Sequence, residues 1–244
     1  MYVSSVKIEN LRCFERETVE FVHPDAGLER RFSNVTLLVG DNGVGKTTVL
    51  RAVSLVVLNI ALQQAGYVPY SMVRRTTIGR GSRAALRAVI SCHPQDLNGT
   101  LFQQSMFGHD DWESSLSIAR KGDVEYVVDD IAPELVPYER ELYSDRSPGV
   151  LVLGYGATRR VDPASEFSPR LRRKTRTLRY DRVASLFEEQ VALLSWASWF
   201  PEVRHEKPHI YARVCELLDQ LIPQDTRFTG ELDGELPEAS LSER

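Results

Sequence analysis

Two short runs of mainly apolar residues organise the chain, and each is followed directly by glycine. The first run covers 35–39 (Val-Thr-Leu-Leu-Val) and the second covers 150–153 (Val-Leu-Val-Leu). Runs of this kind are typical of strands that are buried on both faces of a sheet. After the first run, apolar residues recur at the spacing of one helix face, at Val49, Val53, Val56 and Ile60. The pattern therefore predicts a buried strand, a loop and an amphipathic helix in succession.

Alternating apolar and polar positions predict further strands, each with one face buried. Residues 2–8 and 17–22 are one such pair, and a third strand is expected around Leu86 to Cys92. Residues 115–118 and 124–128 flank the turn Lys121-Gly122-Asp123, which predicts a hairpin. Because no helical pattern separates these later strands, we expect an antiparallel β flap attached to the sheet that holds 35–39.

The last third of the chain has two helical patterns and a hairpin pattern. Ser185-Leu-Phe-Glu188 is a capping box, and the helix that it opens is expected to end at Phe200-Pro201. Pro208 is expected to begin a second helix. The apolar face of that helix consists of Ile210, Val214, Leu217, Leu218 and Leu221. Residues 227–232, followed by Asp233-Gly234, predict a hairpin.

Composition indicates a globular protein of ordinary polarity. The chain has 244 residues, 42% of them hydrophobic, with a net charge of −4, so its surface as a whole is not suited to polyanions. The N-terminus lacks the apolar core of a signal peptide, and the longest apolar run, 52–62, is too short to span a bilayer. Cys13, Cys92 and Cys215 show no metal-binding spacing. We expect a soluble, cytoplasmic protein without a membrane partner.

The segment between the first predicted strand and its helix carries the clearest chemistry. It reads Gly40-Asp41-Asn42-Gly43-Val44-Gly45-Lys46-Thr47-Thr48, which fits the phosphate-binding pattern G-x-x-x-x-G-K-[ST]. Its glycines let successive N–H groups turn toward an anion, and the start of the helix adds unpaired N–H groups. Lys46 is expected to reach the β- and γ-phosphates as the catalytic residue, and the Thr47 hydroxyl is expected to ligate Mg²⁺. We therefore expect residues 40–48 to bind the cofactors ATP and Mg²⁺.

Two other features leave alternatives open. If 150–153 runs parallel to 35–39, then Tyr155, Arg159 and Arg160 emerge beside the phosphates; otherwise they belong to a surface turn. Residues 159–182 hold nine basic and three acidic residues. This segment is either a contact for nucleic acid or a solvated loop.

Several of these segments resemble the N-terminal half of the ABC-type ATPases of the SMC and RecF group. The resemblance rests on Val6-Lys-Ile-Glu-Asn-Leu-Arg-Cys-Phe14, on Asn42 in the third position of the loop, and on Leu50-Arg-Ala-Val53. Gly154-Tyr-Gly-Ala-Thr-Arg159 and Ser185-Leu-Phe are similar to a subgroup found in anti-phage ATPase–nuclease systems such as Septu and some retrons.

This resemblance implies an α/β fold of the ABC/SMC P-loop type, with a mixed sheet around the phosphate loop, an antiparallel β flap and a helical subdomain. It implies an ATP-binding lobe that closes into a homo- or hetero-dimer through the nucleotide site. Dimer closure would act on DNA or RNA, or on a nuclease partner, in DNA repair or anti-phage defence. Arg12 matches an arginine that in this group lies near the nucleotide or couples it to DNA.

The family's second half supplies a signature segment, an apolar strand that ends in Asp-Glu, and a switch His. None of these appears before Arg244, and no Gln follows 150–154, where the family has one. The resemblance therefore implies that the catalytic Glu lies outside this chain. We divide the chain into an ATP-binding lobe with its flap (1–160), a basic segment with a helical subdomain (161–225), and the start of a further lobe (226–244).

Two rival functions fit the same motif. One is a self-sufficient P-loop NTPase or kinase, in which Asp129 or Asp130, at the end of Val124-Glu-Tyr-Val-Val, holds Mg²⁺. The other is a non-catalytic module in which nucleotide binding gates an assembly. The first rival predicts hydrolysis by the isolated chain, whereas the second predicts binding without turnover.

Overall fold

The structure is a computed structural model. It divides into two compact units, Met1–Ala157 with Arg172–Glu189, and Thr158–Leu171 with Gln190–Arg244, and each is described by itself. The domain boundaries expected at 160 and 225 remain predictions. The residues that the structure describes are 2–22, 35–75, 83–91, 111–128, 142–144, 150–157, 161–162, 178–189, 191, 193–194, 196–221, 226–233 and 238–243.

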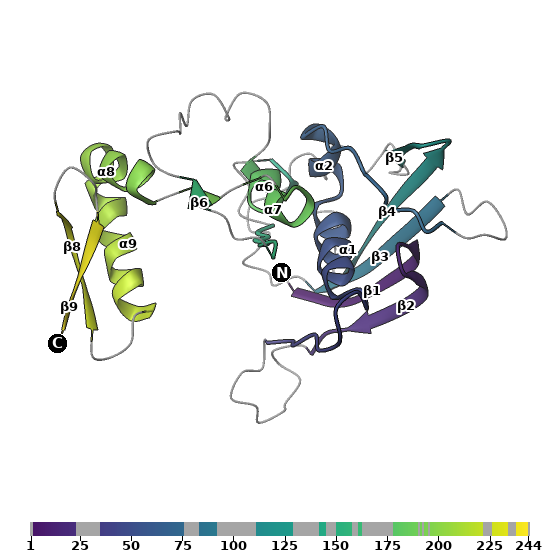
Figure 1. Cartoon of the computed structure of the whole chain (residues 1–244), viewed down its shortest axis with the longest axis horizontal. Helices are drawn as coiled ribbons and strands as arrows, with labels where there is room; N and C mark the ends of the chain where they lie inside the picture. Colours follow the sequence, from purple (N-terminus) through teal and green to yellow (C-terminus); the bar gives the residue numbers. More distant parts are fainter. Residues whose placement is uncertain are drawn as a thin grey trace. The chain divides into compact units, whose positions relative to one another are not determined.

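The first unit is built on one five-stranded sheet, in which every neighbouring pair of strands is antiparallel. The strands follow the order β2-β1-β3-β4-β5 (Figure 1). Their bounds are Tyr2–Leu11 (β1), Phe14–Glu20 (β2), Arg83–Ser91 (β3), Asp111–Lys121 (β4) and Val124–Val128 (β5). The predicted β4–β5 hairpin is confirmed. The expected antiparallel β flap on a sheet that holds 35–39 is wrong, because its strands continue the sheet of β1 and β2 through the pairing of β3 with β1.

Helix α1 (Lys46–Leu58) lies across one face of this sheet, as Figure 1 shows. The sheet buries alternate side chains beneath it, namely Val6, Ile8, Leu86, Ala88, Ile90, Leu116 and Ile118. The helix buries Val49, Ala52, Leu55 and Val56. Each of the Val, Leu and Ile side chains stabilises the fold by about 1.5–3 kcal/mol, so this layer is the core of the unit. The predicted amphipathic helix is confirmed for Val49 to Val56, although it ends at Leu58 and Ile60 lies beyond it.

Asn59 ends α1 and separates it from α2 (Ile60–Gln64). Its backbone is left-handed, at φ 36°, and its buried amide Nδ2 donates to the Ser115 carbonyl at 3.2 Å. Ser114 Oγ donates to the carbonyl of Val56, in the last turn of α1, at 2.7 Å. These polar contacts fix the end of the helix on β4.

The two apolar runs differ from expectation. Residues 35–39 and 150–153 form no strand with any described residue. Val35, Leu37 and Val39 are 64%, 81% and 84% exposed, and Leu151 is 66% exposed. A buried strand needs hydrogen-bonding neighbours and cover on both faces. The predicted buried strands and the mixed sheet around the phosphate loop are therefore wrong for this structure, because the described residues supply no such neighbours.

The segment after 177 also differs from its sequence pattern. Two short helices, α6 (Leu178–Asp181) and α7 (Ala184–Phe187), lie here. The single helix expected from Ser185 to Phe200 is wrong, because α7 ends at Phe187 and another helix begins at Trp196. Ser185 does not cap a helix: its Oγ accepts a hydrogen bond from the N–H of Gly156 at 3.2 Å. Pro201 lies inside α8 (Trp196–Glu206) and does not end it.

The second unit contains α8, α9 (Pro208–Leu221) and two small sheets. β6 (Val161–Asp162) pairs in parallel with β7 (Leu193–Leu194), and β8 (Thr226–Asp233) pairs antiparallel with β9 (Glu238–Glu243). The helix at Pro208 and the hairpin are therefore confirmed, although the turn itself lies outside the described residues. Phe200 of α8 is buried, and its ring centroid lies 4.7 Å from that of Tyr211.

The apolar face that was expected for α9 is only partly covered. None of its side chains is buried, and Ile210, Leu217 and Leu221 are exposed. Among the residues that the structure describes, we find no helix with both the length and the apolar content that crossing a bilayer requires.

Candidate phosphate-binding site

The loop before α1 has the backbone geometry that its glycines allow. Gly43 and Gly45 have φ values of 90° and 107°, which side chains rarely permit. Gly45 occupies the N-cap of α1 and no side chain caps the helix there. The first-turn N–H groups of α1 are therefore available to an anion, and the positive end of the helix dipole adds to their attraction.

Lys46 folds back over the loop. Its Nζ donates to the carbonyls of Gly40 and Asp41, at 2.6 Å and 2.7 Å. These contacts hold the ammonium at the mouth of the loop, where the triphosphate chain of a nucleotide would offer it stronger acceptors. The loop residues therefore fit a nucleotide triphosphate.

The two threonines that follow Lys46 have different surroundings. Thr47 is exposed, so its hydroxyl is accessible to a cation bound with the phosphates. Thr48 is buried in the unit, 5% exposed. The geometry thus fits Thr47, and not Thr48, as the Mg²⁺ ligand. Within the described part of the chain, no group of three or more His, Cys, Asp or Glu side chains gathers to hold a metal.

The turn between β1 and β2 packs directly on this loop. A Cβ atom placed on Gly45 would lie 2.6 Å from both Cys13 Sγ and Phe14 Cζ. Cys13 Sγ also lies 3.8 Å from the Val44 carbonyl. Glycine is therefore required at position 45 both by its φ and by this close approach, and the β1–β2 turn acts as a wall of the site.

Arg12 precedes these two residues in the turn, in a left-handed conformation at φ 48°. Its N–H donates to the Met72 carbonyl at 2.8 Å, and its Nε donates to the Ser71 carbonyl at 3.2 Å. Burial and the nearby charge of Arg12 lower the pKa of Arg51, a residue of α1. Two guanidinium groups thus lie near each other, one on the turn that contacts Gly45 and one on the helix that Gly45 opens. This arrangement favours an anion close by.

The loop Gly154-Tyr155-Gly156 is held rigidly against α7. Gly154 donates its N–H to the Arg182 carbonyl at 3.0 Å, and Gly156 donates to Ser185 Oγ. Neither glycine has space for a Cβ, because Leu186 and the Ser185 carbonyl lie against them. Tyr155 between them is 56% exposed. The condition that would bring Tyr155 beside the phosphates, a parallel sheet pairing, is not met; Arg159 and Arg160 lie outside the described residues.

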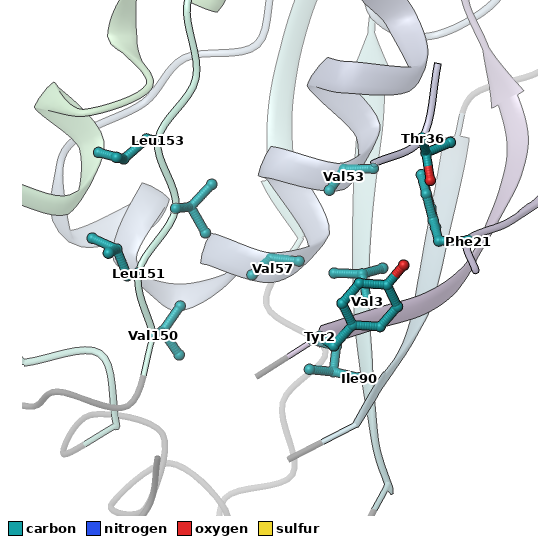
Figure 2. Close-up of a pocket in the computed structure, with 11 residues that line it drawn as sticks. Tyr2, Val3, Phe21, Thr36, Val53, Val57, Ile90, Val150, Leu151 and Leu153 are labelled. Atoms are coloured by element: carbon teal, nitrogen blue, oxygen red, sulfur yellow. The ribbon is translucent and has the colours of Figure 1, made fainter. Parts of the chain in front are cut away.

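A cavity of about 520 Å³ separates the two apolar runs. Figure 2 shows Thr36 on one side, Val150, Leu151 and Leu153 on the other, and Val53 and Val57 of α1 between them. Tyr2, Val3, Phe21, Ile90 and Val152 complete the lining. The cavity is thus mainly apolar and is bounded by two extended segments whose backbones have no strand partner among the described residues.

Comparison with known proteins agrees with this geometry. Residues 1–100 match an AAA ATPase domain. The matched region contains the phosphate loop, the β1–β2 turn and α1, and ATP is the nucleotide that this family implies. No curated protein matches the chain by sequence.

The chain is also similar to a solved structure described as "Structural biochemistry of ATP-driven dimerization and DNA stimulated activation of SMC ATPases". The identity is 14% and the TM-score is 0.42, over 71% of this chain and 96% of that chain.

The structure thus places Lys46, Thr47 and the loop backbone together, and Arg12 lies in the turn whose next two residues, Cys13 and Phe14, contact Gly45. Asp129 and Asp130, the Mg²⁺ ligands of the rival NTPase hypothesis, lie outside the described residues. Sequence reasoning missed the contacts of Cys13, Phe14 and Arg51. It also assigned no role to Glu125. A carboxylate at an inward position of a strand is a signal of a buried polar contact, and it was available in the sequence.

Proposed function

We propose that this chain is the ATP-binding lobe of an SMC/RecF-like ATPase and that Mg²⁺-ATP binds at residues 40–48. The observation that carries the proposal is the open N-terminus of α1, with Lys46 and Thr47 both at the mouth of a glycine-shaped loop. The loop and helix N–H groups would bind the β- and γ-phosphates, and Thr47 would ligate Mg²⁺. Arg12 would contribute positive charge from the wall of the site.

Hydrolysis needs more than this cradle. A carboxylate must orient the attacking water, and donors must reach the γ-phosphate from the opposite side. We propose that a second polypeptide segment, in cis or in trans, supplies these groups. Strands from that segment would pair with 35–39 and 150–153 and fill the cavity between them, which would cover Leu37, Val39 and Leu151. ATP-driven dimer closure would then act on a nucleic acid or on an associated nuclease, in DNA repair or anti-phage defence.

Calorimetric titration of Mg²⁺-ATP into Lys46→Ala tests the nucleotide site. We expect binding to be lost while the melting temperature is unchanged, because the hydrogen bonds of the Lys46 ammonium with the described residues go to exposed loop carbonyls. Lys7→Ala is the matched control, since Lys7 is an exposed lysine of β1 outside the site. Wild-type affinity in Lys46→Ala would reject the phosphate-loop assignment.

A further inference from the structure

We infer that Glu125 is a positioning residue for the phosphate loop, through a strap of residues 71–74 that holds the β1–β2 turn against Gly45. The inference rests on the proposed function, since it concerns how the ATP site is kept in shape. Glu125 does not touch the nucleotide loop itself. Its role follows from a series of contacts that begins at its carboxylate.

The first contact joins Glu125 to the strap. The side chain is 4% exposed, and its two oxygens accept hydrogen bonds from consecutive backbone N–H groups. Met72 N donates to Oε2 at 2.7 Å, and Val73 N donates to Oε1 at 3.1 Å. A buried carboxylate that accepts two backbone N–H groups binds them more strongly than a neutral acceptor would. Glu125 therefore fixes both the position and the orientation of the strap.

The second contact joins the strap to the turn. Besides the two hydrogen bonds from Arg12 to the Met72 and Ser71 carbonyls, Arg74 N donates to the Asn10 carbonyl at 2.8 Å. Leu11 and Val73 form an isolated antiparallel bridge between these hydrogen bonds. Residues 71–74 of the strap thus pair with residues 10–12 of the turn.

The third contact joins the turn to the phosphate loop. Cys13 and Phe14 follow Arg12 directly, and they are the residues that leave no space for a Cβ at Gly45. A displacement of the strap would move the turn, and a displaced turn would release or press upon the N-cap of α1.

Backbone conformation shows that this arrangement is imposed by its surroundings. Asn10, Arg12 and Ser71 all have left-handed φ values, of 52°, 48° and 51°. Such conformations persist in residues other than glycine only where neighbouring contacts hold them, and they gather at functional sites. Here they lie in the two facing segments that Glu125 supports.

Charged side chains of the β1–β2 turn, of α1 and of β5 act on one buried phenol. Arg51, Glu125 and Arg12 all act on the phenol of Tyr67, whose pKa is raised by burial. Glu125 and Glu188 are the acidic members of this group, and their charges are opposite to those of the two guanidinium groups.

The test compares ATP affinity with stability in Glu125→Gln. The amide retains one acceptor oxygen but presents an NH₂ group to the other backbone N–H. We expect ATP affinity to fall by about fivefold to tenfold, a coupling of ordinary size between linked sites. Deuterium uptake by the phosphate-loop amides of the nucleotide-free chain should rise in the same variant. Glu113→Gln, an exposed glutamate on β4, should bind ATP like the wild type.

Loss of stability alone is controlled by Ile118→Val, a change to a fully buried residue of β4. Ile118→Val should lower the melting temperature, as Glu125→Gln does, and yet retain wild-type ATP affinity and phosphate-loop exchange. Equal effects in Glu125→Gln and Ile118→Val, or no effect in Glu125→Gln, would overturn the inference.

A second variant decides the matter if Glu125→Gln does not fold. Cys13→Ala with Phe14→Leu removes the atoms that lie against Gly45 and leaves Glu125 and the strap intact. We expect weaker ATP binding and faster phosphate-loop exchange, and wild-type values for both would overturn the inference.

Loss of binding in Lys46→Ala alongside normal binding in these variants would reject the role of Glu125 only. Normal binding in Lys46→Ala would reject the proposed function itself.

Discussion

Arg51 of α1 donates from Nε to the backbone carbonyl of Leu186 at 2.6 Å, across 135 positions of sequence. Leu186 also lies against Gly154, so one residue contacts both the phosphate-loop helix and the glycine loop that displays Tyr155. The helix that follows the phosphate-loop motif is thereby connected to the loop at the end of the second apolar run.

Replacement of Arg51 by alanine should destabilise the first unit. The change leaves the Leu186 carbonyl without its charged donor, and a hydrogen bond from a charged group contributes about 1.5–3 kcal/mol. We expect a loss of about 1–2 kcal/mol in the free energy of unfolding, because Arg51 is only half-buried. Urea unfolding measures it. Arg16→Ala, at an exposed ion pair on β2, should change stability by less than about 0.5 kcal/mol. Equal losses in both variants would contradict the role of the Arg51–Leu186 contact.

Alanine at Gly45 should be more harmful than alanine at Gly43. Both glycines have φ values that strain a side chain, which costs about 1 kcal/mol or more at each position. Only Gly45 faces a clash, with Cys13 and Phe14, whereas a Cβ on Gly43 would meet nothing within 4 Å. We expect Gly45→Ala to lower the melting temperature further than Gly43→Ala and to lose ATP binding. Differential scanning calorimetry and titration distinguish the two, and identical behaviour would show that the turn yields to a methyl group.

Alanine substitutions at Thr47 and Thr48 should have different effects, the first on metal binding and the second on the packing of the unit. Thr47→Ala should abolish the increase in ATP affinity that Mg²⁺ provides while stability is unchanged, because its hydroxyl is exposed. Thr48→Ala should instead cost about 1 kcal/mol of stability through lost packing at a buried position. Titrations with Mg²⁺ and with EDTA make the comparison, and Thr47→Ser should behave as the wild type. A Mg²⁺ effect that survives in Thr47→Ala would assign the metal to another ligand.

Isolated residues 1–244 should bind Mg²⁺-ATP weakly and release phosphate near the background rate. The described residues contain the proposed phosphate cradle and the proposed ligand Thr47 but no gathered carboxylates that could hold a metal. Addition of a complementing segment, in cis or in trans, should restore hydrolysis and ATP-dependent dimerisation. Phosphate release and light scattering follow the two effects. Robust Lys46-dependent turnover by the isolated chain, lost in Asp129→Asn or Asp130→Asn, would favour the self-sufficient NTPase.

The sequence by itself determined the features that depend on a few consecutive residues. The phosphate loop and the start of α1 follow from Gly40–Thr47, since glycine conformations and helix N–H groups are local properties. The face of α1 and the β4–β5 hairpin follow from residue spacing in the same way. The prediction of a capping box at Ser185 is wrong because a distant loop competes for the hydroxyl. The N–H of Gly156 donates to Ser185 Oγ, in place of the N–H of a helix residue.

Only the tertiary structure decided which distant residues shape the site. Cys13 and Phe14 meet Gly45 because β1 and β2 close a tight turn there, and Glu125 of β5 contacts the strap although β3 and β4 lie between β5 and β1 in the sheet. Composition marks residues 35–39 as a buried strand, yet burial of a strand depends on partners that the run itself does not encode. A backbone edge is paired only when another segment supplies its hydrogen bonds, and that is a property of the assembled sheet rather than of five apolar residues.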